Sequence, residues 1–72
     1  MKIAYTLHAK ERILKRKIKK DWIENTIKNP DKLKSGYLNR KIAVKSINKE
    51  KITVVFVIED ETMVVLTVYW GE

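Results

Sequence analysis

The sequence contains no cysteine, one histidine, one proline and two glycines. Without cysteine there is no disulfide, thiol nucleophile or cysteine-ligated metal, and one histidine cannot build a histidine-based zinc site. Two glycines can hardly form a phosphate-binding loop, and P-loop, GxGxxG and HExxH patterns do not occur. We therefore predict neither a metal ion nor a small-molecule cofactor.

Long apolar segments are also missing. The longest run of apolar and threonine residues is Ile52–Ile58, which is far shorter than the ~20 residues that span a bilayer. Charged residues such as Lys2 and Lys10 interrupt the N-terminal segment, so it does not have the apolar stretch of a signal peptide. We expect a cytoplasmic protein with no membrane partner.

Positive charge, in contrast, is plentiful and unevenly spread. The 72 residues carry a net charge of +7. Residues 1–51 hold all sixteen Lys and Arg against five acidic residues, whereas residues 52–72 hold four acidic residues and no basic one. Such a charge distribution favours a polyanion or an acidic protein as partner. The alternative is that the many lysines are only solvated surface residues, since arginine is the better phosphate ligand.

Two helices are expected in the N-terminal half, after a short extended segment at residues 2–5. Leu7–Ile18 lacks Gly and Pro and is rich in strong helix formers, and Thr6 can cap it. A second helix is expected from Lys20 to Asn29, where Pro30 ends it. No glycine separates the two, so one bent helix remains an alternative.

The C-terminal half has the patterns of β-strands. Leu33–Leu38 is a weak strand interrupted by Gly36, and stronger strands are expected over Lys41–Ile47, Lys51–Ile58 and Thr62–Trp70. In the last strand, alternation places Val64, Leu66, Val68 and Trp70 toward the helices. The whole chain, residues 1–72, is thus predicted to be a single α+β domain of order β-α-α-β-β-β-β, with two helices on a mainly antiparallel sheet.

His8 is the first candidate for chemistry. It falls in the first turn of the first helix, one turn before Arg12. The helix dipole and the guanidinium both disfavour an imidazolium, so we expect a neutral ring that can act as a general base. The alternative is an ordinary surface or capping histidine.

Basic side chains supply the candidate binding surface. Arg12 and Arg16 lie on one helix flank, and Arg40, Lys41 and Lys45 form a second group. Lys41 and Lys45 share a strand face because their spacing is even. If this face also carries Tyr69, which can stack on a base or donate a proton, the two together form an RNA groove. The alternative is a solvated basic face.

Several short motifs carry a family resemblance. They are His8-Ala9-Lys10-Glu11-Arg12, Asn29-Pro30-Asp31, Ile52–Phe56 and Val65–Tyr69. In this order they resemble a small family of uncharacterised bacterial and archaeal domains with an HAxER…NPD…TVY pattern, grouped with the RelE/ParE toxin superfamily. Relatives usually have glycine and then a Ser or Thr cap near the end of the first helix, where this sequence has Lys17 and Lys19.

The resemblance implies a RelE-like fold and the toxin of a toxin–antitoxin module. The implied activity is a metal-independent endoribonuclease, in which the 2′-hydroxyl of RNA attacks the adjacent phosphate. His8 would then be the base or acid, Arg12 the phosphate clamp, and Tyr69 the stacking group or proton donor. The implied partners are RNA, free or ribosome-bound, and an acidic antitoxin. Two alternatives stay open, namely a ParE-like module that binds a protein target and a general RNA-binding protein.

Overall fold

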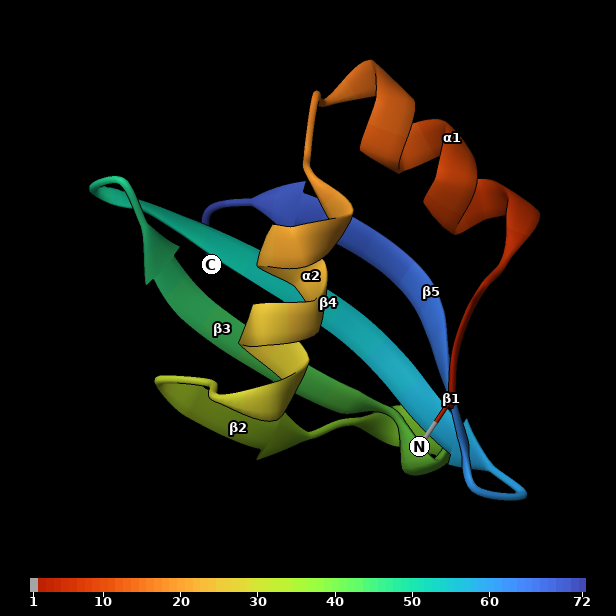
Figure 1. Ribbon diagram of the computed structural model, residues 1–72. Helices are drawn as coiled ribbons and strands as arrows, with labels where there is room; N and C mark the ends of the chain where they lie inside the picture. The colour runs from red at the N-terminus through yellow and green to blue at the C-terminus, as the bar shows by residue number, and fades with distance from the viewer. Residues whose placement is uncertain (1) are drawn as a thin grey trace.

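The structure, a computed structural model, describes residues 2–72. It has the predicted element order, with two helices packed on one face of a five-stranded sheet (Figure 1). The elements are β1 (Lys2–Tyr5), α1 (Leu7–Lys15), α2 (Lys20–Lys28), β2 (Lys32–Ser35), a 3-10 turn η1 (Tyr37–Asn39), β3 (Lys41–Ile47), β4 (Glu50–Glu59) and β5 (Thr62–Trp70). The α+β prediction is therefore confirmed.

The strands lie in the order β1-β5-β4-β3-β2. Only β1 runs parallel to its neighbour, and the other three pairings are antiparallel. The hairpins β3–β4 and β4–β5 turn at Asn48–Lys49 and Asp60–Glu61, and all four of these residues have positive φ. Two-residue turns of this kind match the twist of the flanking strands. Local turns therefore fix the register of the three central strands.

The first helix ends three residues before the predicted end at Ile18. Lys17 adopts a left-handed backbone with φ of 54°. The amide of Lys17 donates to the Leu14 carbonyl, and the amide of Ile18 donates to the Ile13 carbonyl. These two bonds form a Schellman motif, which normally has glycine at the left-handed position. The chain thus breaks between the helices without a glycine, and the alternative of one bent helix is wrong.

The core lies between the helices and the sheet. Ile23 of α2 is completely buried, and so are Ile52 and Val54 of β4 and Val65 and Val68 of β5. In Figure 1, α2 crosses over β3 and β4, whereas α1 lies along β5. Among the described residues, no helix is both long and apolar enough to cross a bilayer.

The predicted face assignment of β5 is only half right. Val68 and Trp70 do face the helices, but Met63 and Val65 pack there as well, and Val64 does not. The reason is a β-bulge, because the β4–β5 register slips between Val55 and Phe56 and leaves one extra residue in β5. A bulge of this kind reverses the alternation of side chains beyond it.

The expected strand Leu33–Leu38 is also shorter than predicted. It ends at Ser35, and Tyr37 and Leu38 belong to η1 instead. Leu38 has φ of 56° there, and both side chains are largely exposed. A residue with a left-handed backbone cannot continue a strand. The strand was predicted too long because Tyr37 and Leu38 are apolar, although neither side chain is buried.

Candidate functional site

Within residues 2–72, the last part of β5 has no strand beside it on its outer edge. β1 pairs with β5 only as far as Val65. Beyond that point, the side chains of Thr6 and Arg16, which cap the two ends of α1, take the place of a strand. The Thr6 hydroxyl donates to the Leu66 carbonyl at 3.2 Å, and an Arg16 guanidinium nitrogen donates to the Val68 carbonyl at 2.8 Å. Two carbonyl groups of this edge are thereby satisfied.

A second bond runs in the opposite direction at the same junction. The indole nitrogen of Trp70 donates to the Arg16 carbonyl at 3.0 Å. The Trp70 ring also packs edge-on against Trp22, with 5.6 Å between ring centroids. The end of α1 is therefore fastened to β5 by reciprocal hydrogen bonds, and α1 is held at a fixed distance from the strand edge.

Between α1 and this edge lies an open pocket of about 610 Å³. It is lined by His8, Arg12, Arg16, Thr67, Tyr69 and Trp70. His8 and Arg12 come from successive turns of α1, so their side chains lie on the same helix face. The sequence did not establish whether His8 and Tyr69 lie in one site, and the structure places both in the wall of this pocket.

The pocket wall carries basic side chains and no acidic ones. It contains two arginines and a histidine and no carboxylate. Arg12 forms no ion pair among the described residues, whereas Arg16 is already bonded to the Val68 carbonyl. His8 is exposed. A guanidinium without a counter-ion beside an imidazole and a phenol can bind an anion such as phosphate.

A hollow of equal volume lies beside the β4–β5 turn, lined by Lys2, Asp60, Glu61 and Thr62. Its two carboxylates oppose a single ammonium group, so this hollow would repel a phosphate. It contains none of the predicted site residues. The pocket at the β5 edge is therefore the better candidate for a polyanion.

Arg40 and Lys41 do not belong to that pocket. They line a smaller hollow of about 290 Å³ together with Ile58. Ile58 lies five residues along β4 from Thr53, the partner of Tyr69, which corresponds to roughly 17 Å. Arg40 and Lys41 are thus at the opposite end of the sheet from His8 and Arg12.

The predicted groove of Lys41 and Lys45 facing Tyr69 is wrong. Lys41 and Lys45 do share a strand face, but it is the helix-covered face, since Lys45 pairs with the buried Ile52. Lys45 donates to the Asn29 carbonyl at 2.8 Å and lies 3.9 Å from the Asp31 carboxylate. Tyr69 lies opposite Thr53, on the other face of the sheet.

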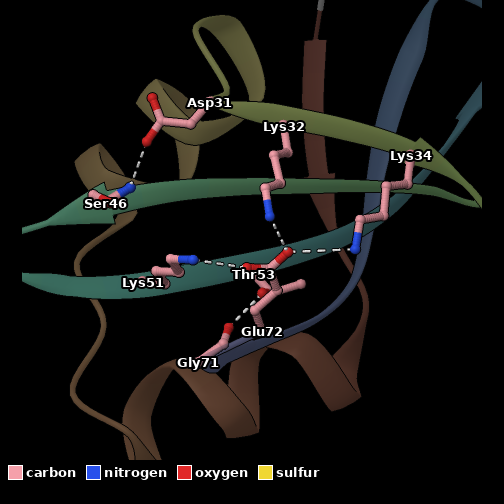
Figure 2. Close-up of polar contacts among 8 residues, drawn as sticks. All are labelled: Asp31, Lys32, Lys34, Ser46, Lys51, Thr53, Gly71 and Glu72. Atoms are coloured by element: carbon pink, nitrogen blue, oxygen red, sulfur yellow. Dashed lines mark hydrogen bonds and ion pairs between the residues drawn. The ribbon is translucent and has the colours of Figure 1, made fainter.

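A basic cluster that the sequence did not single out lies on the same face as Tyr69, which neither helix covers and which we call the open face. Lys32 and Lys34 of β2 and Lys51 of β4 all reach the carboxylate of Glu72, as Figure 2 shows. We call these three residues the lysine cluster. The even spacing of Lys32 and Lys34 was visible in the sequence. Their convergence with Lys51 was not, because it depends on strand order.

The lysine cluster changes the titration of Glu72. Its hydrogen bonds, first of all those from Lys32 and Lys51, lower the pKa of Glu72 from 4.5 to about 2. The carboxylate is therefore ionised at neutral pH, and three ammonium groups surround it.

Within residues 2–72, no group of three or more His, Asp or Glu side chains is arranged to hold a metal ion.

Comparison with known proteins identifies a family without an assigned activity. The chain belongs to the family described as "Domain of unknown function (DUF4258)", whose model matches residues 5–70. No curated protein and no solved structure matches the chain. The resemblance to a small uncharacterised domain family is thereby confirmed, while its grouping with the RelE/ParE toxins stays a prediction.

Proposed function

We propose that this member of the DUF4258 family binds single-stranded RNA at the β5 edge and cleaves it without a metal ion. The observation that carries the proposal is that His8, Arg12 and Tyr69 line one pocket. They come from opposite ends of the chain and provide a base, a cation and a phenol. Cleavage of a phosphodiester by its own 2′-hydroxyl requires these three kinds of group.

The proposed reaction has one nucleophile and one leaving group, both supplied by RNA. The 2′-oxygen attacks the adjacent phosphorus, and its proton passes to the His8 imidazole. The Arg12 guanidinium binds the phosphate oxygens as negative charge builds on them. The bond from phosphorus to the 5′-oxygen breaks, and the Tyr69 hydroxyl donates a proton to that oxygen. The products are a 2′,3′-cyclic phosphate and a 5′-hydroxyl.

Arg16 has a different part in this scheme. Its guanidinium is bonded to the Val68 carbonyl and so holds α1 against β5. It acts as a positioning residue, because the spacing between His8 and Tyr69 depends on where α1 lies. Arg16 also lines the pocket and adds positive charge to it.

The biological role we propose is that of a toxin in a cytoplasmic toxin–antitoxin pair. The net charge of +7 supports an acidic antitoxin as the protein partner. The RNA substrate in this proposal is free or ribosome-bound RNA. A short acidic reading frame beside the gene would support this role.

A non-catalytic binding module is the second candidate. It is favoured by the environment of His8, whose side chain is exposed and makes no hydrogen bond within residues 2–72. Catalytic bases are generally oriented by a further group. Such a module would bind RNA or a protein target through the same basic pocket and leave the RNA intact.

Incubation of purified protein with a labelled single-stranded RNA in EDTA tests the proposal. We expect cleavage that leaves 2′,3′-cyclic phosphate ends and is lost in His8→Ala, Arg12→Ala and Tyr69→Phe. Arg40→Ala and Tyr37→Phe are matched controls, because Arg40 lines another hollow and Tyr37 is 90% exposed in η1. Binding with a steep salt dependence and no cleavage would instead identify the non-catalytic module.

A further inference from the structure

The lysine cluster has the geometry of an anion-binding site. Lys32 and Lys51 each lie 2.9 Å from a carboxylate oxygen of Glu72, and Lys34 lies 3.4 Å from one of them. The lysine side chains are about half exposed, whereas that of Glu72 is only 25% exposed. Three donors thus enclose one acceptor group (Figure 2).

The backbone after β5 brings the carboxylate to this place. Gly71 has φ of +94° and donates from its amide to the Lys51 carbonyl at 2.7 Å. The Thr53 hydroxyl donates to the Gly71 carbonyl. These two bonds fold the chain back over β4, so that Glu72 lies above the open face of the sheet, among the lysines.

The charge of the cluster exceeds that of its occupant. Three ammonium groups face one side-chain carboxylate, so the basic side chains outnumber the acidic one. None of the three lysines has another acidic partner among the described residues, because the remaining ion pair joins Lys45 and Asp31. A group with more negative charge and more acceptor oxygens than a carboxylate, such as a phosphate, fits this site better.

The cluster and the pocket are connected across the sheet. Register pairs link Lys32 to Val44, Val44 to Thr53 and Thr53 to Tyr69, so these four residues form one row on the face opposite the helices. Val44 and Thr53 are themselves buried, so only the two ends of the row, Lys32 and Tyr69, are available to a ligand. Three strand spacings separate the backbone of Lys32 from that of Tyr69, which is about 14 Å. An RNA strand with one phosphate in the pocket reaches the cluster within a few nucleotides.

We propose that Lys32, Lys34 and Lys51 bind a second phosphate of the RNA strand, and that the Glu72 carboxylate occupies this site until RNA displaces it. The inference rests on the proposed function and adds a path for the strand across the open face. Glu72 then acts as an internal competitor and lowers the affinity for RNA.

Binding of a fluorescent single-stranded RNA, measured over a range of salt concentrations, tests the proposal. We expect Glu72→Gln to bind about two- to fivefold more tightly, as the loss of a surface competitor allows. Lys34→Ala should bind more weakly and lower the slope of log affinity against log salt by about 0.7. Glu59→Gln and Lys28→Ala are charge-matched controls at exposed positions away from the cluster, because Glu59 is at the far end of β4 and Lys28 is in α2, on the helix-covered side of the sheet. Both should behave like the wild type.

Two results separate failure of this inference from failure of the proposed function. If RNA is bound and cleaved in a His8-dependent way but Glu72→Gln and Lys34→Ala match their controls, the second phosphate site is refuted and the ribonuclease stands. If no RNA is bound, the ribonuclease and the RNA path are both refuted. A titration with inorganic phosphate, followed by the NMR signal of the Gly71 amide, then reports whether the cluster binds anions at all. Tighter binding of an acidic peptide than of RNA by Glu72→Gln would assign the cluster to a protein partner and overturn our assignment.

Discussion

Replacement of Lys17 by glycine should stabilise the protein. Lys17 has φ of 54° at the end of α1, in the position where a Schellman motif favours glycine. A left-handed backbone costs an ordinary L-residue about 1–2 kcal/mol, and glycine avoids that cost. The side chain of Lys17 is exposed and makes no hydrogen bond or ion pair within residues 2–72. Its removal should therefore cost little free energy of unfolding.

Glycine also has more conformational freedom in the unfolded chain, which lowers the free energy of unfolding by roughly 0.5–1 kcal/mol and offsets part of the stabilisation. We therefore expect Lys17→Gly to raise the free energy of unfolding by about 0.5–1 kcal/mol. For a domain of this size the midpoint of thermal unfolding should rise by about 2–8 °C. Urea and thermal unfolding followed by circular dichroism measure both quantities.

Two control variants make the reasoning refutable. Lys10 is exposed in the interior of α1, so Lys10→Gly should lower the free energy of unfolding by about 0.5–1 kcal/mol, the opposite sign for the same chemical change. Lys17→Ala keeps the left-handed strain and should bring no gain. If Lys17→Gly is destabilising, or if Lys17→Ala stabilises as much, the backbone of Lys17 is not the source of strain.

Three further changes probe other contacts. The Tyr5 hydroxyl is buried and has no hydrogen-bond partner within residues 2–72. Burial and, to a lesser extent, the charge of Glu24 raise the pKa of Tyr5. Tyr5→Phe should therefore match the wild type or be more stable by up to about 1 kcal/mol in urea unfolding. Because the pKa of Glu72 is lowered to about 2, its ion pairs stabilise the fold above pH 4.5 and are lost as the pH falls toward 2. Urea unfolding between pH 2 and 6 should show that loss in the wild type and a flatter profile in Glu72→Gln. Arg16→Ala removes the bond to the Val68 carbonyl and should cost about 1–2 kcal/mol in the same assay; no measurable loss would show that this bond does not hold α1 in place.

Much of the fold follows from local patterns in the sequence. The strand Lys41–Ile47 has the predicted bounds, and α2 ends one residue before the predicted Asn29. These elements have strong signals, namely β-branched alternation and a proline stop. The end of α1 was missed because the left-handed residue there is a lysine, and nothing in the chemistry of lysine marks such a turn.

The site was predictable only where its residues share a local element. His8 and Arg12 lie four residues apart on one helix, so their common face could be inferred. The lysine cluster could not, because Lys51 meets Lys34 only through the placement of β2 and β4 on either side of β3. For the same reason, the sequence could not show that Arg12 and Arg40 line separate hollows.

The bulge in β5 decides the chemistry of the pocket. Val65 and Val68 are both completely buried although their spacing is odd, and only an extra residue between them permits this. In a regular strand, Tyr69 would share the face of Val65 and lie under the helices. The bulge instead turns Tyr69 to the open face, in the row that leads to Lys32, while the neighbouring Trp70 stays toward the core. The bulge interrupts the β4–β5 hydrogen bonds at one point. In return, it places Tyr69, the one tyrosine that lines the pocket, on the proposed RNA path.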